Sequence, residues 1–200
     1  MLITGIKSRP VYDVLRPLAG GKHHIIAGQG SGGSALLRLL NDMPQGAATI
    51  RVLYSPESFS GTEYLTEIQA VSGVTLDIYP TGHQLVTALY DLLARAAMGT
   101  RLYLAGSESF IGTAMQAADA INLNKDEVLR EHCGSFVRRV WCVHCSGYTE
   151  NVTQRVFDCP HCARTLVVRD HYSRRLAAFQ AVKADAEVPG ELPQAEELDT

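Results

Sequence analysis

The segment HHIIAGQGSGGSALLRLL (residues 23–40) runs from a short apolar stretch through a glycine-rich turn into a helical pattern. Residues 23–27 are typical of a buried strand, and residues 34–40 predict a helix with Ser34 near its start. A strand that enters a helix through glycines is the first half of a βαβ unit. The segment therefore predicts an α/β domain with a parallel sheet.

The same alternation of strand and helix continues along the chain to residue 136. Further strands are expected at residues 48–54, 74–79 and 101–105 and within 128–136. Helices are expected around Tyr64, Leu65 and Ile68, over residues 83–98, and from residues 106–109 to Ala120. Strict alternation of this kind indicates a Rossmann-like parallel sheet with helices packed on it.

Two loops of the expected sheet are candidates for a ligand site. Parallel α/β sheets bind ligands outside the carboxyl ends of their strands, near the point where the strand order reverses. Gly28, Gly30 and Ser31 follow the first strand and can bring backbone N–H groups to a phosphate at a helix N-terminus. Gly106 and Ser107 follow a later strand in the same way. Tight turns use the same residues, so the glycine-rich loop also fits a purely structural role.

The dinucleotide fingerprint is incomplete at the second strand. That strand ends in Tyr54-Ser55-Pro56, without the acidic residue that grips a ribose in such sites. The histidines of residues 23–24 open a buried strand and are expected to be structural. We find no self-sufficient catalytic triad, so no residue is predicted to be catalytic.

Four of the five cysteines form two Cys-x-x-Cys pairs, Cys142 with Cys145 and Cys159 with Cys162. Each pair can present two thiolates to one tetrahedral metal ion, and two such pairs on facing hairpins close a four-sulfur site. Four ordinary thiols or two disulfides are the alternative. Cys133 stands apart and is expected to be a small buried apolar residue.

Zinc and iron both fit a four-thiolate site. Zinc would act as a staple for a zinc-ribbon-like module too small to have its own core, whereas rubredoxin-type iron would make an electron carrier. The stretch from Trp141 to Val168 offers few aromatic residues for the shell of an iron carrier, which favours zinc. The histidines at positions 144 and 161 lie between cysteines and are expected to form hydrogen bonds or be exposed.

Charge and composition narrow the possible partners. Residues 183–200 carry six acidic residues against one lysine, a balance of −5, so the rest of the chain carries +2 of the total of −3. No basic stripe suggests nucleic acid, and no apolar run is long enough to cross a membrane. The first residues lack the pattern of a secretory signal, so we expect a soluble, cytoplasmic chain whose thiols bind metal.

The order of these segments resembles the NAD(P)-binding domain of ferredoxin reductase-like enzymes, over residues 23–135. Residues 27–31 are similar to its Gly-Gly-x-Gly start, and residues 52–68 to its second strand and helix, as in the phthalate dioxygenase reductase branch. Residues 102–111 resemble the strand and Cys-Gly-Pro loop beside the nicotinamide. The resemblance implies that Gly28, Gly30 and Ser31 face the pyrophosphate of NAD(P)H.

The same resemblance implies that Gly106 and Ser107 lie near the nicotinamide, but the sequence departs from the family there. Ala105 stands where the family has cysteine, and Gly32-Gly33 replaces Thr-Pro. Only about 22 residues precede the first strand, too few for the flavin barrel, and no plant-type [2Fe–2S] motif is present. The flavin is therefore expected on another polypeptide.

The whole arrangement is similar to the A-subunit family of bacterial dimethylamine monooxygenase. That family joins a reductase-like region to a Cys-x-x-Cys module, followed by segments like residues 170–179 and 184–190. The resemblance implies a multisubunit enzyme that uses NAD(P)H and O2 to convert dimethylamine to methylamine and formaldehyde. It also implies that partner subunits carry the flavin, the iron–sulfur cluster and the haem.

Four regions are predicted from these observations. Residues 1–22 form an N-terminal arm, residues 23–136 the NAD(P)-binding domain, residues 137–169 the metal module, and residues 170–200 a docking helix with an extended acidic tail. Tyr172, Leu176 and Phe179 lie at helical spacing. The proline-containing tail is not expected to bury a core.

Three functions remain open from the sequence. The first is a nucleotide-binding or structural subunit of an NAD(P)H-dependent amine monooxygenase, with zinc used for assembly. The second is a rubredoxin-like electron carrier fused to a degenerate nucleotide fold. The third is a zinc-ribbon interaction protein without a redox role.

Overall fold

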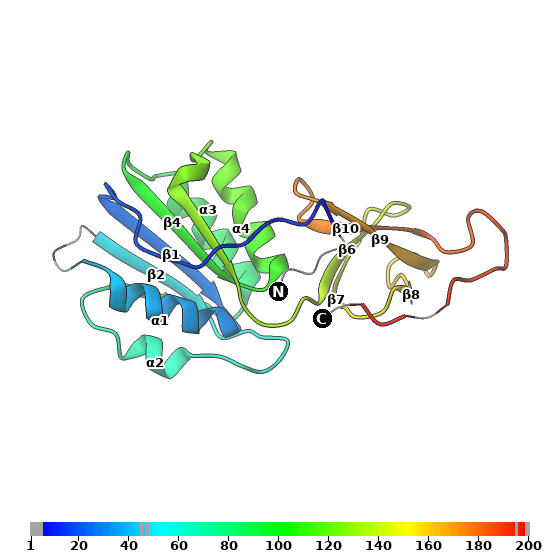
Figure 1. The fold of residues 1–200 in the computed structure, drawn as a ribbon, viewed down its shortest axis with the longest axis horizontal. Coiled ribbons are helices and arrows are strands. Elements are labelled where there is room, and N and C mark those ends of the chain that lie inside the picture. Colours follow the sequence, from blue (N-terminus) through cyan, green and yellow to red (C-terminus); the bar gives the residue numbers. More distant parts are fainter. Residues whose placement is uncertain (1–5, 45, 47–48, 195, 199–200) are drawn as a thin grey trace. The chain divides into compact units, whose positions relative to one another are not determined.

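The computed structural model describes residues 6–44, 46, 49–194 and 196–198, which form two compact units. One unit comprises residues 12–135. The other combines residues 6–11 with the described residues from 136 onward. Figure 1 shows a sheet with helices in the first unit and a sheet without helices in the second.

The first unit is built on a five-stranded, entirely parallel sheet in the order β3-β2-β1-β4-β5. Its strands are β1 (His23–Gln29), β2 (Thr49–Ser55), β3 (Thr75–Ile78), β4 (Thr100–Gly106) and β5 (Val128–His132). The chain builds outward from β1 to β3 and returns to the other side at β4. The strand order therefore reverses between β1 and β4, and this topology confirms the predicted α/β fold.

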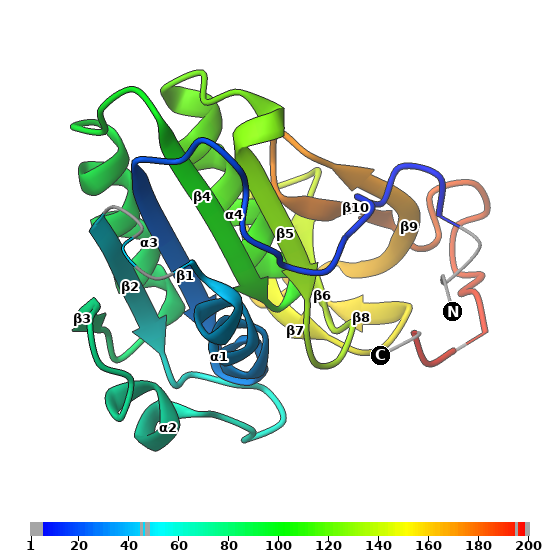
Figure 2. The same cartoon turned by 60° about the vertical axis from the view of Figure 1, so that its left-hand side comes forward.

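Helices cover both faces of this sheet (Figure 2). They are α1 (Gly33–Asp42), α2 (Leu65–Gln69), α3 (Gly82–Leu93) and α4 (Glu108–Ala120), with short 3-10 turns at η1 (Gly30–Gly32) and η2 (Lys125–Glu127). In β1, Ile26 packs with α1 and α2, whereas Ile25 and Ala27 pack with α3 and α4. Because of this alternation, residues 24–28 of the central strand are buried on one face or the other.

Helix α3 is shorter than the helix predicted over residues 83–98. It ends at Leu93, which is also the last residue of the buried apolar stripe formed by Leu85, Leu89 and Leu93. Met98 lies beyond that stripe and is 95% exposed. The helix ends where its apolar face no longer has a sheet to cover.

An extended strap, residues 12–18, lies against the face of the sheet that carries α1. Leu15 is buried in that core, and its backbone amide donates to the carboxylate of Glu131 over 2.7 Å. The amide of Leu18 donates to the hydroxyl of Tyr103, and Nδ1 of His24 forms a hydrogen bond with the same hydroxyl over 3.1 Å. Burial lowers the pKa of His24, and this direction fits the structural role expected of this histidine.

The second unit contains a five-stranded sheet in the order β7-β6-β10-β9-β8. The strands are β6 (Arg138–Cys142), β7 (Tyr148–Val152), β8 (Val156–Asp158), β9 (Thr165–Ser173) and β10 (Ala178–Lys183). Only β6 and β10 are parallel, and the other neighbours are antiparallel. Val140, Leu166, Val168 and Phe179 belong to its core.

The docking helix predicted for residues 170–200 is wrong, because this segment continues the second sheet. Strands β9 and β10 form an antiparallel hairpin that pairs Phe179 with Tyr172. Leu166, Val168 and Tyr172 point inward at even spacing along β9, which is the two-residue period of a strand. Tyr172 and Phe179 have helical spacing in the sequence, but they lie on two strands separated by a turn in which Ala177 adopts a φ of 49°.

The prediction that the acidic tail buries no core is also wrong at its far end. Leu198 is 4% exposed and lies in the core of the second unit. Its amide donates to the carbonyl of Thr153, and Gln154 forms an antiparallel β-bridge with Glu197. The returning segment 196–198 thus adds a short strand-like pairing, although residues 187–194 are exposed as expected.

Residues 6–11 complete the second unit from the opposite end of the sequence. Ile6 packs against its core, and the hydroxyl of Ser8 accepts a 2.8 Å hydrogen bond from the backbone amide of Tyr172. The guanidinium of Arg9 lies 4.7 Å from the ring centre of Phe136 and 5.2 Å from that of Phe179. We call residues 6–11 the N-terminal clip, because they fix this unit from a segment distant in sequence.

Replacing Asp170 with asparagine is expected to destabilise the second unit by about 2 kcal/mol. The carboxylate pairs with Arg138, which is 2% exposed, at 3.0 Å, and with Arg155 at 3.5 Å. Without it, the buried Arg138 charge loses this carboxylate partner and retains the ring of Phe179, 4.5 Å from the guanidinium carbon. Urea unfolding measures the loss, and Glu187→Gln, an exposed change in the same unit, is the control that leaves the midpoint in place.

The sign of the accompanying pH effect follows from the pKa of Asp170. Partial burial raises this pKa, but the hydrogen bond and charges of Arg138 and Arg155 outweigh burial and hold it below its usual 3.8. The stabilisation is therefore fully present above pH 3.8 and is lost as the pH falls through the lowered value.

Candidate metal centre

Two turns of nearly identical construction carry the four cysteines. In the first, the amide of Cys142 donates to the carbonyl of Gly147, and the carbonyl of Cys142 accepts from Ser146, both at 2.9 Å. In the second, Cys159 forms the same two bonds with Arg164 and Ala163, again at 2.9 Å. The residue after each second cysteine has a positive φ, 60° at Ser146 and 55° at Ala163. Each turn therefore bends the chain so that two sulfurs point the same way.

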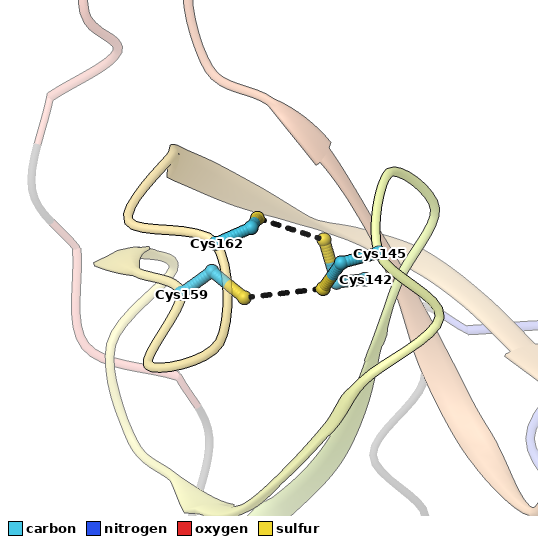
Figure 3. A group of neighbouring side chains, drawn as sticks. All are labelled: Cys142, Cys145, Cys159 and Cys162. Carbon is cyan, nitrogen blue, oxygen red and sulfur yellow. Dashed lines mark hydrogen bonds between the residues drawn. The ribbon is translucent and has the colours of Figure 1, made fainter.

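The two turns bring all four sulfur atoms into one cluster (Figure 3). Each Sγ lies within 4.8 Å of the others, with Cys142 and Cys162 at 3.9 Å and Cys145 and Cys159 at 3.7 Å. Metal–sulfur bonds of about 2.3 Å in a tetrahedron place the sulfurs about 3.8 Å apart. All four cysteines are free thiols. The spacing predicted from sequence thus produces a donor set with the chemistry and dimensions of a tetrahedral metal site.

Backbone amides and neighbouring thiols control protonation at this cluster. The amide of Arg164, assisted by its guanidinium, lowers the pKa of Cys162 to about 6. The amide of Gly147 acts in the same direction on Cys145, but burial and hydrogen bonds from the other three cysteines raise the pKa of Cys145 to about 12. Full ionisation of four thiols this close together requires a cation, and a divalent metal supplies it.

Each cysteine pair also places a histidine directly before its second cysteine. Nε2 of His161 lies 2.8 Å from the carbonyl of Tyr148, so this nitrogen must carry the proton that it donates. Nε2 of His144 instead accepts from the backbone amide of Lys183 over 3.1 Å. A Cβ on Gly147 would lie 2.4 Å from the ring of His161, so glycine is needed there. Both histidines make the backbone hydrogen bonds expected of them and brace the turns from outside the sulfur cluster.

The predicted nucleotide residues lie along the carboxyl edge of the first sheet. The hydroxyl of Ser107 caps α4 by accepting from the amide of Phe110 at 3.2 Å, and it donates to Oε1 of Gln29 at 2.9 Å. Because β1 and β4 are neighbours, this bond spans the point where the strand order reverses. The structure therefore brings Ser107 to the end of β1, beside the glycine-rich turn.

The glycines of this edge serve different purposes. Gly30 has a φ of +51°, which turns the chain from β1 into η1, and its carbonyl accepts from the hydroxyl of Tyr54 at 2.7 Å. A Cβ on Gly28 would lie 2.7 Å from the side chain of Leu36, so this glycine lets α1 approach the sheet. Gly106 has a φ of +150° and approaches the backbone of Gln29. Ser31 lies close to Gly134, because a Cβ added at Gly134 would be 3.3 Å from the hydroxyl oxygen of Ser31.

Sequence reasoning missed Glu57, an acidic residue just beyond the end of β2. Its Oε2 accepts from the amide of Gly82 at the start of α3, at 2.7 Å, and from Nε2 of Gln29, at 3.2 Å. Glu57 stands two residues past Ser55, the last residue of β2, so the acidic residue sought at the strand end is displaced into the loop. No local sequence signal links Glu57 to the N-terminus of α3, because Gly82 lies 25 positions further along the chain.

Cys133 plays no part in the sulfur cluster and lies in the first unit. It is half-buried against the core that contains α1, and burial raises the pKa of its thiol to about 11. Among the described residues, none of the helices has both the length and the apolar character needed to cross a membrane.

Comparison with known families gives two matches that together span most of the chain. Residues 4–128 match the model of the N-terminal domain of dimethylamine monooxygenase subunit DmmA-like proteins, and residues 139–182 match that of the C-terminal domain. A similar protein is the heme-dependent oxidative N-demethylase delta subunit of Ectopseudomonas mendocina (strain ymp). It is 33% identical over 119 residues, which are 60% of this chain and 68% of that protein.

Solved structures with related folds are more distant in sequence. Phthalate dioxygenase reductase is 13% identical, with a TM-score of 0.46. The match covers 83% of this chain and 66% of the reductase. An intact type IV self-sufficient cytochrome P450 monooxygenase is 16% identical, with a TM-score of 0.48. The match covers 85% of this chain and 21% of the monooxygenase. The siderophore interacting protein of Acinetobacter baumannii shares 14% with a TM-score of 0.43, and the match covers 56% of this chain and 47% of that protein.

Proposed function

Because this chain belongs to the family of dimethylamine monooxygenase subunit DmmA-like proteins, we propose that it is a reductase-side subunit of a multicomponent amine monooxygenase. The complex would use NAD(P)H and O2 to convert dimethylamine to methylamine and formaldehyde in the cytoplasm. The observation that carries the proposal is the match of both domains to one family, together with a four-sulfur centre in the second. The relative named as a delta subunit of a heme-dependent N-demethylase supports membership of a multisubunit enzyme.

In this proposal the partner subunits carry the flavin, the [2Fe–2S] cluster and the haem, and this chain contributes binding and assembly. Cys142, Cys145, Cys159 and Cys162 would hold a zinc ion that fixes the two turns of the second sheet. Zinc bound by four thiolates adds structure without redox chemistry. The chain's own residues hold the turns, orient the sulfurs and present the surrounding surface to partners. No residue of this chain is proposed to be catalytic.

Simple measurements distinguish zinc from iron at this site. A purified chain that is colourless and contains one zinc per chain by elemental analysis supports the structural role. A coloured protein with iron bound to the same four sulfurs would instead support the rubredoxin-like carrier.

We propose that the carboxyl edge of the first sheet is the nucleotide side of the subunit. Gly28, Gly30 and Ser31 would face the pyrophosphate, and Gly106 and Ser107 the nicotinamide. The support is their position at the edge where the strand order reverses, with α1 beginning directly after the glycine-rich turn.

Gly30→Trp is expected to weaken NAD(P)H binding to the assembled complex at least about 100-fold, because the indole would fill the proposed pyrophosphate position. Isothermal titration of the complex measures the affinity. Gly61→Trp is the matched control, since Gly61 also has a positive φ, +76°, but has open space around it. Equal affinity in the wild-type and Gly30→Trp complexes would remove the nucleotide role and leave a scaffold.

A zinc-ribbon interaction protein without a redox role makes a different prediction. It would purify as a stable chain that recovers neither a flavoprotein nor a haem protein. Affinity purification from the native host therefore separates it from the monooxygenase subunit, which is expected to recover both.

A further inference from the structure

The side chain of Gln29 closes the carboxyl edge at the point where the strand order reverses. It extends from the last residue of β1 and bonds to Ser107, after β4, and to Glu57, after β2. Glu57 in turn accepts from the amide of Gly82, so one chain of hydrogen bonds links the starts of α3 and α4. This edge is where open α/β sheets bind their ligands.

The two partners of Gln29 fix the orientation of its amide. The carboxylate of Glu57 can only accept, so it must face the NH2 group at 3.2 Å. The hydroxyl of Ser107 then donates to the amide oxygen at 2.9 Å. Together they offer one donor and one acceptor, the arrangement that a primary carboxamide requires.

The surroundings of the amide show a position shaped to receive it. A Cβ on Gly82 would lie 2.7 Å from Nε2 of Gln29, so the start of α3 leaves room for this group because it is glycine. Gln29 and Ser107 are only half-buried, and Glu57 is exposed, so the position can be reached from solvent.

We infer that Glu57 and Ser107 form a binding site for a primary carboxamide, and that Gln29 occupies it as a built-in plug. The ligand class is the carboxamide of a nicotinamide ring, the primary amide that NAD(P)H carries. This inference rests on the proposed nucleotide role of the edge. It adds that the nicotinamide end enters only when Gln29 gives up its two hydrogen bonds.

Gln29→Ala is expected to bind NADH or NADPH about tenfold more tightly than the wild-type chain, because the ligand no longer displaces the plug. Isothermal titration of the full-length chain measures this. ADP-ribose, which lacks the nicotinamide, should bind both proteins equally. Gln69→Ala, at the exposed end of α2, is the control variant that leaves every affinity unchanged.

Gln29→Asn provides a second test if the alanine variant is unstable. It keeps an amide on the side chain of residue 29, but this side chain is one methylene too short to reach both Glu57 and Ser107. The variant should therefore also bind NADH or NADPH more tightly than the wild type. Thermal melting shows whether each variant is folded.

The outcomes separate this inference from the proposed function. Equal NADH affinity in the wild type and Gln29→Ala, or an equal gain for ADP-ribose, overturns the plug and leaves the nucleotide role in place. A second outcome overturns both the plug and the nucleotide role. In that outcome no variant binds any dinucleotide, and Gly30→Trp leaves the NAD(P)H affinity of the assembled complex unchanged.

Discussion

Cys159→Ser is expected to abolish metal binding and to unfold the second unit while the first stays folded. Cys142 and Cys159 are each 2% exposed and anchor opposite turns of the sulfur cluster, so loss of either sulfur opens the centre towards the core. Structural zinc contributes about 10 kcal/mol or more to the folding of small modules, which exceeds the stability of most domains. Elemental analysis and limited proteolysis measure the two losses.

Cys133→Ser is the matched control, because Cys133 lies in the first unit and outside the cluster. Its metal content should equal that of the wild type. A strong zinc chelator applied to the wild type should reproduce the proteolytic pattern of Cys159→Ser. A chelated protein whose second unit resists protease would show that the sheet holds without the metal, contrary to the proposed staple.

Gly32→Ala is expected to destabilise the first unit by about 3 kcal/mol or more. A Cβ at this position would lie 2.2 Å from the carbonyl oxygen of Ala105 and 2.4 Å from its carbonyl carbon. Both are backbone atoms of β4, so relief requires a movement of α1 relative to the sheet. The measurement is the urea midpoint of the unit that contains residues 12–135.

Gly61→Ala separates this steric effect from backbone strain. Gly61 has a φ of +76° with open space around it, so alanine there should cost only about 1 kcal/mol. Equal losses at positions 32 and 61 would mean that conformational freedom, and not close approach, explains Gly32. The same contact gives a physical reason why the Thr-Pro of the reductase pattern is replaced in this sequence.

The parts of the fold that follow from local sequence were predictable. The glycine-rich turn after residues 23–27 and the strict alternation that follows it specify a parallel sheet, since each strand must return through a helix. The four sulfurs were predictable for a similar reason. Each Cys-x-x-Cys turn is a local structure, and two such turns have few ways to satisfy their thiols other than one shared ion.

The parts that depend on distant contacts were not predictable. Tyr172 and Phe179 fit a helical period when the turn between them is ignored, and only their pairing across β9 and β10 reveals the strands. The burial of Leu198 requires a partner at Thr153, which its acidic surroundings do not suggest. Glu57 was missed because the path of the loop after β2, and not the strand itself, aims its carboxylate at the edge.

The N-terminal clip has a consequence for the order of events during biosynthesis. Ser8 leaves the ribosome before its hydrogen-bond partner Tyr172, which lies 164 positions later. Residues 12–135 contain their own core and can fold while the rest is still being translated. The clip must wait unpaired until Phe179 emerges, so the second unit is completed only after the first unit can already have folded.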